Sequence, residues 1–169
     1  MNIYGLIDTI IEREGEYVNH EADMGGATKY GITQDTLTAY RGYPVSENDV
    51  EAMTRTEAVS IYVARYIEQP RFDDIDNVAL ASLIIDSGVN HGVTRAAKWL
   101  QQAAGVKVDG MVGAKTLEAV NNQNAGTIYR KVLAERTRFY GRIITNNPTQ
   151  AVFAAGWTAR LSEFIEDMM

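Results

Sequence analysis

Two acidic residues near the start of the chain have the types and the spacing that acid–base chemistry would need. Glu14 ends an apolar helical stripe, and Asp23 follows nine residues later, directly before Met24 and the pair Gly25 and Gly26. Paired glycines let the backbone turn tightly or approach a ligand closely. One carboxyl group could then protonate a leaving oxygen while the other activates water or steadies an oxocarbenium-like centre. Glycoside hydrolysis requires this pairing.

Glu14 is the candidate general acid. At 100° per residue it falls between Ile10 and Ile11 on the apolar face of the first predicted helix, whereas Glu12 and Glu16 fall nearly opposite. A carboxyl group at the end of a hydrophobic stripe faces the interior or a cleft wall, where desolvation raises its pKa. A general acid needs such a shift to stay protonated near neutral pH. The alternative is a frayed last turn that leaves Glu14 in solvent.

Other polar residues could assist this chemistry. Thr28 and Tyr30 could position a water molecule or a sugar through their hydroxyl groups. Asn90 and His91, in a glycine-bordered break after an apolar helix, could line the cleft and bond N-acetyl groups, although a simple helix cap explains them equally well. Asp23 taken alone fits an Asx-turn beside glycines.

A metal site has few candidate ligands. The chain has no cysteine and only two histidines, His20 and His91. A zinc amidase would need a third ligand such as Asp86 or Asp23, because catalytic zinc is held by a fixed cage of protein ligands. There is also no phosphate-cradling loop. We therefore expect no metal and no organic cofactor.

Composition and charge exclude several classes of protein. The chain has 169 residues, 46% of them hydrophobic, enough for one packed domain or two small lobes. Its formal charge of −6 argues against a nucleic-acid groove, which needs clustered Lys and Arg. The N-terminal stretch lacks the basic start and the unbroken apolar core of a secretory signal. No run approaches eighteen apolar residues, so we expect no stable membrane insertion. Nothing requires more than a monomer.

The elements that position these residues read as mostly helical. A polar, glycine-rich stretch up to Thr33 has room for a short hairpin, and a capping box from Thr54 to Glu57 opens one of the helices. The predicted fold class is α+β, predominantly α-helical, with a small β-hairpin or loop near the N-terminus. Helical periodicity and stop signals predict helices over 2–14, 33–40, 54–67, 78–90, 94–104, 125–144 and 148–166, and a turn leading into a helix within 108–120.

The stretch "EGEYVNHEADMGGATKYGIT" resembles the signature of glycoside hydrolase family 108, the N-acetylmuramidases common among phage endolysins. Two positions depart from that pattern: Glu16 stands where the family usually has glycine, and Met24 replaces a common proline. The matching positions are Glu14, Gly15, Tyr17, Asn19, Asp23, Gly25, Gly26, Thr28, Tyr30, Gly31, Ile32 and Thr33.

The later stretch "DSGVNHGVTRAAKWLQQAAGVKVDGMVGAKTLEAV" resembles the predicted peptidoglycan domain that usually follows this catalytic segment. The two resemblances together cover about residues 5 to 166. They imply a lysozyme-like fold, with a catalytic segment over 1–90 and a helical peptidoglycan-binding segment over 91–169 packed on the first.

The resemblance implies an enzyme that hydrolyses the β-1,4 bond between N-acetylmuramic acid and N-acetylglucosamine. Glu14 would be its general acid, and Asp23 and Thr28 would complete the catalytic set. Tyr30, Asn90 and His91 would bind substrate. It further implies a phage lysis protein that waits in the host cytoplasm and reaches periplasmic peptidoglycan through a separate holin. A lytic transglycosylase using the same glutamate and a non-catalytic wall-binding protein remain the alternatives.

Overall fold

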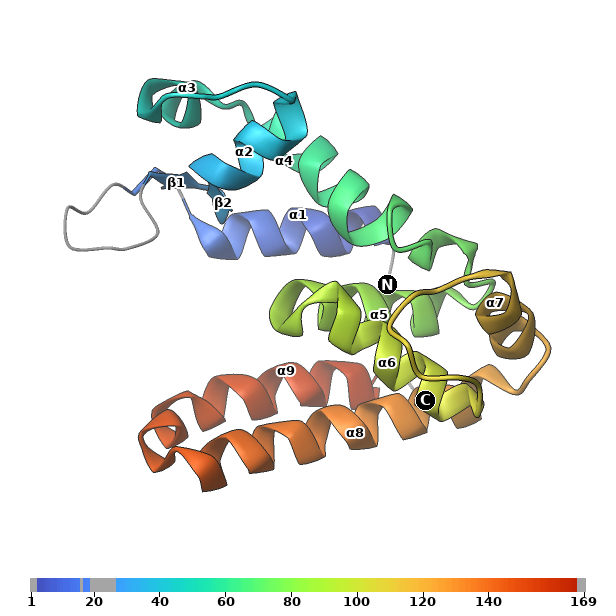
Figure 1. Cartoon of the computed structure of the whole chain (residues 1–169). Coiled ribbons are helices and arrows are strands. Elements are labelled where there is room, and N and C mark those ends of the chain that lie inside the picture. The colour runs from blue at the N-terminus through green and yellow to red at the C-terminus, as the bar shows by residue number, and fades with distance from the viewer. Residues whose placement is uncertain (1–2, 16, 19–26, 167–169) are drawn as a thin grey trace. The chain divides into compact units, whose positions relative to one another are not determined.

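The computed structural model describes residues 3–15, 17–18 and 27–166 of the chain, although only the backbone of several α1 residues, Glu14 among them. These residues form helices and one two-stranded antiparallel sheet (Figure 1), which confirms the predicted α+β class with an N-terminal hairpin. The chain divides into two compact units, Ile3–Arg65 and the chain from Tyr66 onward. The boundary near residue 90 between a catalytic and a binding segment stays a prediction.

The first unit holds the hairpin and the first four α-helices. Helix α1 packs against α4, and α2 and α3 flank the two strands. The elements are α1 (Ile3–Glu14), β1 (Thr28–Lys29), β2 (Ile32–Thr33), α2 (Gln34–Arg41), α3 (Glu47–Ala52) and α4 (Arg55–Val63), which the π-helical turn η1 (Ala64–Glu68) continues into the second unit.

The second unit is helical. Its central helix α5 packs against α6, α8 and the short helix η2, and α8 packs against α9 (Figure 1). The elements are η2 (Phe72–Asp74), α5 (Val78–His91), α6 (Val93–Ala104), α7 (Ala114–Asn121), α8 (Ala125–Asn146), η3 (Pro148–Phe153) and α9 (Ala154–Glu166). No helix of the described chain is both long and apolar enough to cross a membrane.

The apolar stripe predicted for the first helix is the buried face of α1. Ile7, Ile10 and Ile11 are buried, as the helical period requires. Burying side chains of this size contributes roughly 1.5–3 kcal/mol each, so this face anchors α1 to its unit. Glu14, the last residue of α1, therefore follows one turn after the buried pair Ile10 and Ile11.

The capping box predicted at Thr54 forms only in part. The Thr54 side chain accepts a hydrogen bond from the Glu57 backbone amide at 3.2 Å. The Glu57 carboxylate instead accepts bonds from Arg41 Nε and Nη2 at 2.9 and 3.0 Å. A bidentate arginine is a stronger partner for a carboxylate than a backbone amide, so tertiary contact overrides the local motif.

Helix α3 was not predicted from the sequence. It begins with a complete capping box, in which Ser46 Oγ accepts from the Asp49 amide and Asp49 accepts from the Ser46 amide at 2.7 Å. The signal was present in "SEND", because Ser followed three residues later by an acid marks a helix start. The helix has only six residues and one buried side chain, Val50, so it has no readable period.

Helix α5 is surrounded by protein along most of its length. All residues from Leu80 to Gly88 are buried, as the apolar sequence predicts. Asn77 begins the helix by accepting a hydrogen bond from the Leu80 amide at 2.9 Å. This helix is the core of the second unit.

A buried glutamine holds the turn that carries the Asp-Gly pair. Gln101 is 1% exposed, and its Nε2 donates to Asp109 Oδ1 at 2.8 Å and to the Met111 carbonyl at 2.9 Å. Its Oε1 accepts from the Asp109 and Gly110 amides at 3.0 and 2.8 Å. Gly110 adopts a φ of 83° there, a conformation that favours glycine. Part of the stretch that resembles the predicted peptidoglycan domain is thus a hydrogen-bonded turn.

Candidate active site

Glu14 stands where a helix gives way to irregular chain. It is the last residue of α1, and Gly15 follows with a φ of 79°, in the left-handed region. Glycine is favoured at this place because it lets the chain leave the helix without a steric penalty. The side chain of Glu14 lies outside the described atoms, so the structure gives its place on the backbone only.

The predicted hairpin forms just beyond this point. Thr28 pairs with Thr33 and Lys29 with Ile32, so that Tyr30 and Gly31 make a two-residue turn. Both turn residues have positive φ, 53° and 73°, which is the signature of a type I′ turn. Tyrosine rarely adopts this conformation, so the surrounding contacts hold Tyr30 there.

Backbone hydrogen bonds bring the end of α1 and the hairpin together. The Tyr30 amide donates to the Gly15 carbonyl at 3.2 Å. Val18 and Thr28 exchange two backbone bonds, at 2.8 and 2.9 Å, in an antiparallel bridge. The residue after Glu14 is thereby fixed to the turn that carries Tyr30. Three of the predicted site residues, Glu14, Thr28 and Tyr30, accordingly occupy one corner of the first unit.

Asp23 is the site residue about which the structure is silent, because residues 19–26 lie outside the described chain. His20 lies in the same range. The chain on either side is described, and the Val18–Thr28 bridge joins the two flanks. The role of Asp23 therefore stays a prediction.

Sequence reasoning missed Tyr62, a buried residue of α4 that supports this corner. Its hydroxyl donates to the Tyr30 carbonyl at 3.1 Å, and its side chain is 4% exposed. This contact bridges 32 positions in sequence, and no local pattern around Tyr62 announces it. Lys29 adds a second contact, since its Nζ lies 5.4 Å from the centre of the Tyr30 ring.

Asn90 and His91 belong to the second unit, at the C-terminal end of α5. The Asn90 amide donates back to the Asp86 carbonyl at 2.8 Å. His91 Nε2 lies 3.0 Å from the Tyr140 hydroxyl, and its ring meets those of Trp99, Phe139 and Tyr140 edge-on. Burial, with the positive charge of Arg136, lowers the pKa of His91 to about 4. The imidazole is therefore neutral at pH 7 and packs as an aromatic ring.

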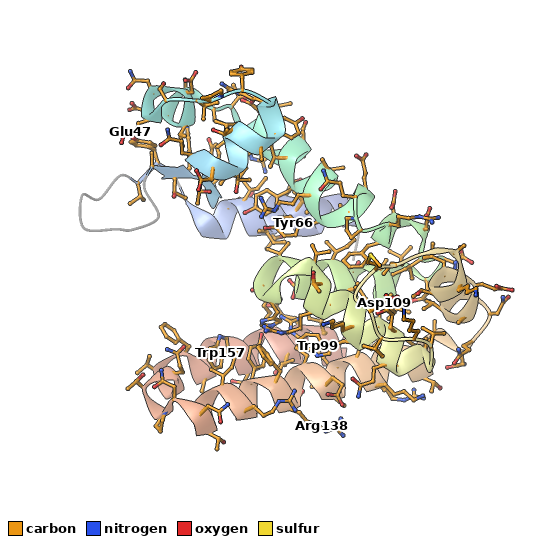
Figure 2. All side chains as sticks on the ribbon, viewed as in Figure 1. Glu47, Tyr66, Trp99, Asp109, Arg138 and Trp157 are labelled. Atoms are coloured by element: carbon orange, nitrogen blue, oxygen red, sulfur yellow. The ribbon has the colours of Figure 1, made fainter. Side chains whose placement is uncertain are left out.

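The two tryptophans, labelled in Figure 2, are linked through the rings of His91 and Tyr140. Trp99 is 6% exposed and is a core residue. Trp157 stacks on Tyr140 with ring centres 4.8 Å apart and an angle of 12°. Trp99 therefore packs in the core, whereas Trp157 is half-buried and stacks on a neighbouring ring.

Asp86, considered as a third metal ligand beside a histidine, binds arginine instead. Its carboxylate is fully buried, 2.6 Å from Arg136 Nη1, and it also accepts hydrogen bonds from Arg160. Within the described chain, no group of three His, Cys, Asp or Glu side chains gathers as a metal site would require. Asp86 thus has a structural place at the junction of α5, α8 and α9.

Comparison with known proteins covers both units. A family model described as "Glycosyl hydrolase 108" matches residues 7–92, and one described as "Predicted Peptidoglycan domain" matches residues 95–162. The chain is also similar to the solved structure of SagA from Brucella abortus. The two share 34% sequence identity with a TM-score of 0.78, over 98% of this chain and 92% of that one. A search of curated proteins found no match.

Proposed function

Since this chain belongs to the glycosyl hydrolase 108 family and is a peptidoglycan-degrading glycoside hydrolase, we propose that it hydrolyses one particular bond. This is the β-1,4 linkage between N-acetylmuramic acid and N-acetylglucosamine. Glu14 is the general acid that protonates the departing sugar oxygen. Thr28 and Tyr30 hold the attacking water or the sugar beside it.

The observation that carries this proposal is the hydrogen bond from the Tyr30 amide to the Gly15 carbonyl. It ties the residue next to Glu14 to the hairpin, which supports a common site for the acid and the two hydroxyl-bearing residues. Rigid placement matters because a catalytic group contributes most when its geometry is set before the substrate arrives.

Asp23 is proposed as the second carboxylate. Hydrolysis needs a group that activates water or steadies the positive charge that develops on the sugar ring. Asp23 follows the acid closely in sequence, and the chain around it begins and ends at the Val18–Thr28 bridge beside the hairpin. The separation of the two carboxyl groups decides between inversion and retention of configuration.

Asn90 and His91 are carried forward as glycan contacts of the second unit. Asn90 is exposed at the end of α5 and retains an amide oxygen that can accept a bond from an N-acetyl group or a hydroxyl. His91 is half-buried and already pairs with Tyr140. Asn90 is thus the better placed of the two to meet a sugar.

The biological setting that we propose is lysis of a bacterial host by a phage, in which a holin releases the enzyme to the periplasmic wall. The family resemblance supports this setting. A direct check is expression in the host cytoplasm with and without a holin: lysis should require both proteins. Lysis by the enzyme alone would contradict the holin-dependent route.

The decisive experiment for the reaction is mass spectrometry of the muropeptides released from purified sacculi. Hydrolysis by a muramidase leaves reducing N-acetylmuramic acid ends. A lytic transglycosylase would leave anhydro ends, one water lighter, and an amidase would free peptides without cutting glycan. A wall-binding protein without activity would release nothing. Any of these last three results would overturn the proposal.

A further inference from the structure

A groove of about 360 Å³ lies in the second unit, lined by α6 and α8. Ala103 and Ala134 give it apolar walls, and Gln102 and Thr127 add an amide and a hydroxyl group. Binding sites for small ligands span roughly 300–1,000 Å³, so the groove is large enough for a short ligand. Nothing in the proposed catalytic reaction uses it.

The groove is basic within an acidic protein. Arg130, Lys131 and Arg138 line it against a single described acid, Glu135. Counted along the sequence, residues 1–65 carry the entire net charge of −6, whereas residues 66–169 have eleven basic and eleven acidic side chains. Helix α8 holds five basic residues and one acidic residue, and four of the five lie outside the buried Arg136–Asp86 ion pair. The exposed surface of α8 thus carries an excess of positive charge, which favours an anionic ligand.

The three basic side chains differ in how many protein partners they already bind. Lys131 Nζ donates to the Ala103 carbonyl at 3.1 Å, near the C-terminal end of α6, and so completes that helix end. Arg130 Nη2 donates to the Thr127 hydroxyl at 3.3 Å. Arg138, labelled in Figure 2, is 61% exposed, and its Nη1 lies 2.6 Å from Glu135 Oε1. An exposed ion pair of this kind contributes about 1 kcal/mol or less, so a ligand can replace it.

We propose that this groove binds the carboxylate-bearing peptide stem of peptidoglycan, an inference that rests on the proposed function. The guanidinium groups of Arg130 and Arg138 each offer a planar fork that matches a carboxylate. The Gln102 amide and the Thr127 hydroxyl suit peptide groups, and the alanine methyls suit small side chains. A nucleic acid is a poorer fit, because its regular phosphates need a longer run of cations than one helix provides.

The test is a titration of the ¹⁵N-labelled full chain with a free stem tetrapeptide, followed by amide chemical shifts. We expect shifts concentrated on α6 and α8. Arg130→Ala and Arg138→Ala should each weaken binding roughly tenfold, the usual effect of losing a charge-assisted hydrogen bond. Arg142→Ala is the matched control, since Arg142 is an exposed residue of the same helix outside the groove. The affinity of this variant for the tetrapeptide should stay within about twofold of the parent value. The stem with an amidated C-terminus should bind less tightly than the free acid.

Two outcomes would overturn the proposal. One is a stem that leaves the α6 and α8 resonances unmoved at millimolar concentration. The other is inorganic phosphate or a short oligonucleotide that competes as well as the stem, which would mark a general anion site. Turnover separates this inference from the proposed function. On glycan strands stripped of peptide, the turnover rate of the two arginine variants should equal that of the parent. On intact sacculi their turnover rate should be lower. A parent chain that cuts neither substrate would refute the reaction, while the titration still reports on the groove.

Discussion

Arg160 of α9 reaches both carboxylate oxygens of Asp86, a fully buried residue of α5, with its Nε 2.9 and 3.1 Å from Oδ1 and Oδ2. Arg136 of α8 approaches the same carboxylate, 2.6 Å from Oδ2, and is itself fully buried. One negative charge thus lies between two positive charges inside the protein. Removing that charge would leave two guanidinium groups without their partner.

We predict that Asp86→Asn destabilises the second unit by about 3–5 kcal/mol, the usual cost of breaking a buried ion pair from one side. Chemical denaturation followed by circular dichroism measures the loss. Arg138→Ala, which breaks an exposed ion pair, is the comparison and should change stability by about 1 kcal/mol or less. An Asp86→Asn protein as stable as its parent would contradict a role for this junction in stability.

His91 should make stability depend on pH. Burial lowers its pKa to about 4, whereas in an unfolded chain histidine titrates near ~6.5. Between these pH values the unfolded state binds more protons than the folded state. The contribution of His91 to the free energy of unfolding is therefore greatest above pH ~6.5 and decreases as the pH drops towards 4. The slope from this residue is at most about 1.4 kcal/mol per pH unit.

The measurement is urea denaturation at several pH values from 5 to 7. His91→Phe keeps an aromatic ring beside Trp99 but cannot titrate, so its slope over this range should be the smaller one. All other ionisable groups are common to both proteins, so their contributions cancel in the comparison. Equal slopes would show that His91 does not take up a proton on unfolding.

Gly110→Ala should destabilise the turn that Gln101 holds. A Cβ atom there would stand 2.8 Å from Thr94 Cγ2, and the φ of 83° is unfavourable for any residue with a side chain. We expect a loss of about 1–2 kcal/mol in a thermal or urea melt. Gly141→Ala is the control. Gly141 lies on helix α8, and a Cβ atom added there would meet no neighbouring atom within 4 Å. Alanine is the better helix former, so that variant should gain about 0.5–1 kcal/mol.

The sequence predicted the fold where one periodic pattern decided it. The stripe Ile7, Ile10 and Ile11 predicted α1, and Gly42 and Gly105 end α2 and α6 with the left-handed φ that their type indicates. The short helix α3 was not predicted, because six residues are too few to show a helical period. At Glu57 a distant arginine outcompeted the local capping motif.

The contacts that support the candidate site were harder to predict than the hairpin itself. The polar, glycine-rich stretch up to Thr33 predicted a short hairpin, yet the hydrogen bond from Tyr62 to Tyr30 joins residues 32 positions apart. The packing of His91 against Tyr140 likewise joins residues 49 apart. Such pairs depend on how the helices pack, which no local pattern records.

A fragment that ends near Gly92 should not fold into a native structure. Helix α5 is buried along most of its length, and its cover in the second unit includes α6 and α8, which follow Gly92. Without them its apolar side chains would be exposed, so we expect aggregation or a molten state. Solubility and near-ultraviolet circular dichroism measure this. A fragment 66–169, which keeps that cover, is the matched comparison, and we expect it to be the more ordered of the two. A cooperative, active fragment 1–92 would contradict the prediction.

Glu14→Gln should abolish turnover with little effect on the fold. Glutamine keeps the shape of the side chain and an acceptor oxygen, but it has no acidic proton to give to the departing sugar oxygen. Loss of a general acid costs roughly 10²- to 10⁴-fold in rate. The measurement is dye release from labelled sacculi, with thermal melts of the same proteins. Because a carboxyl group at an apolar helix end is costly to ionise, stability should hold or rise.

Matched variants make this last prediction specific to position. Glu12→Gln alters a carboxylate that is 73% exposed on the same helix, and it should retain most of the activity. Glu16→Gln, two residues beyond the acid, should do the same. Asp23→Asn should give a large but incomplete loss, because a positioned water can still attack an oxocarbenium-like centre when the second carboxylate is missing. If Glu14→Gln kept more than about a tenth of the parent rate, Glu14 could not be the general acid, and Glu16 would be the next carboxylate to test.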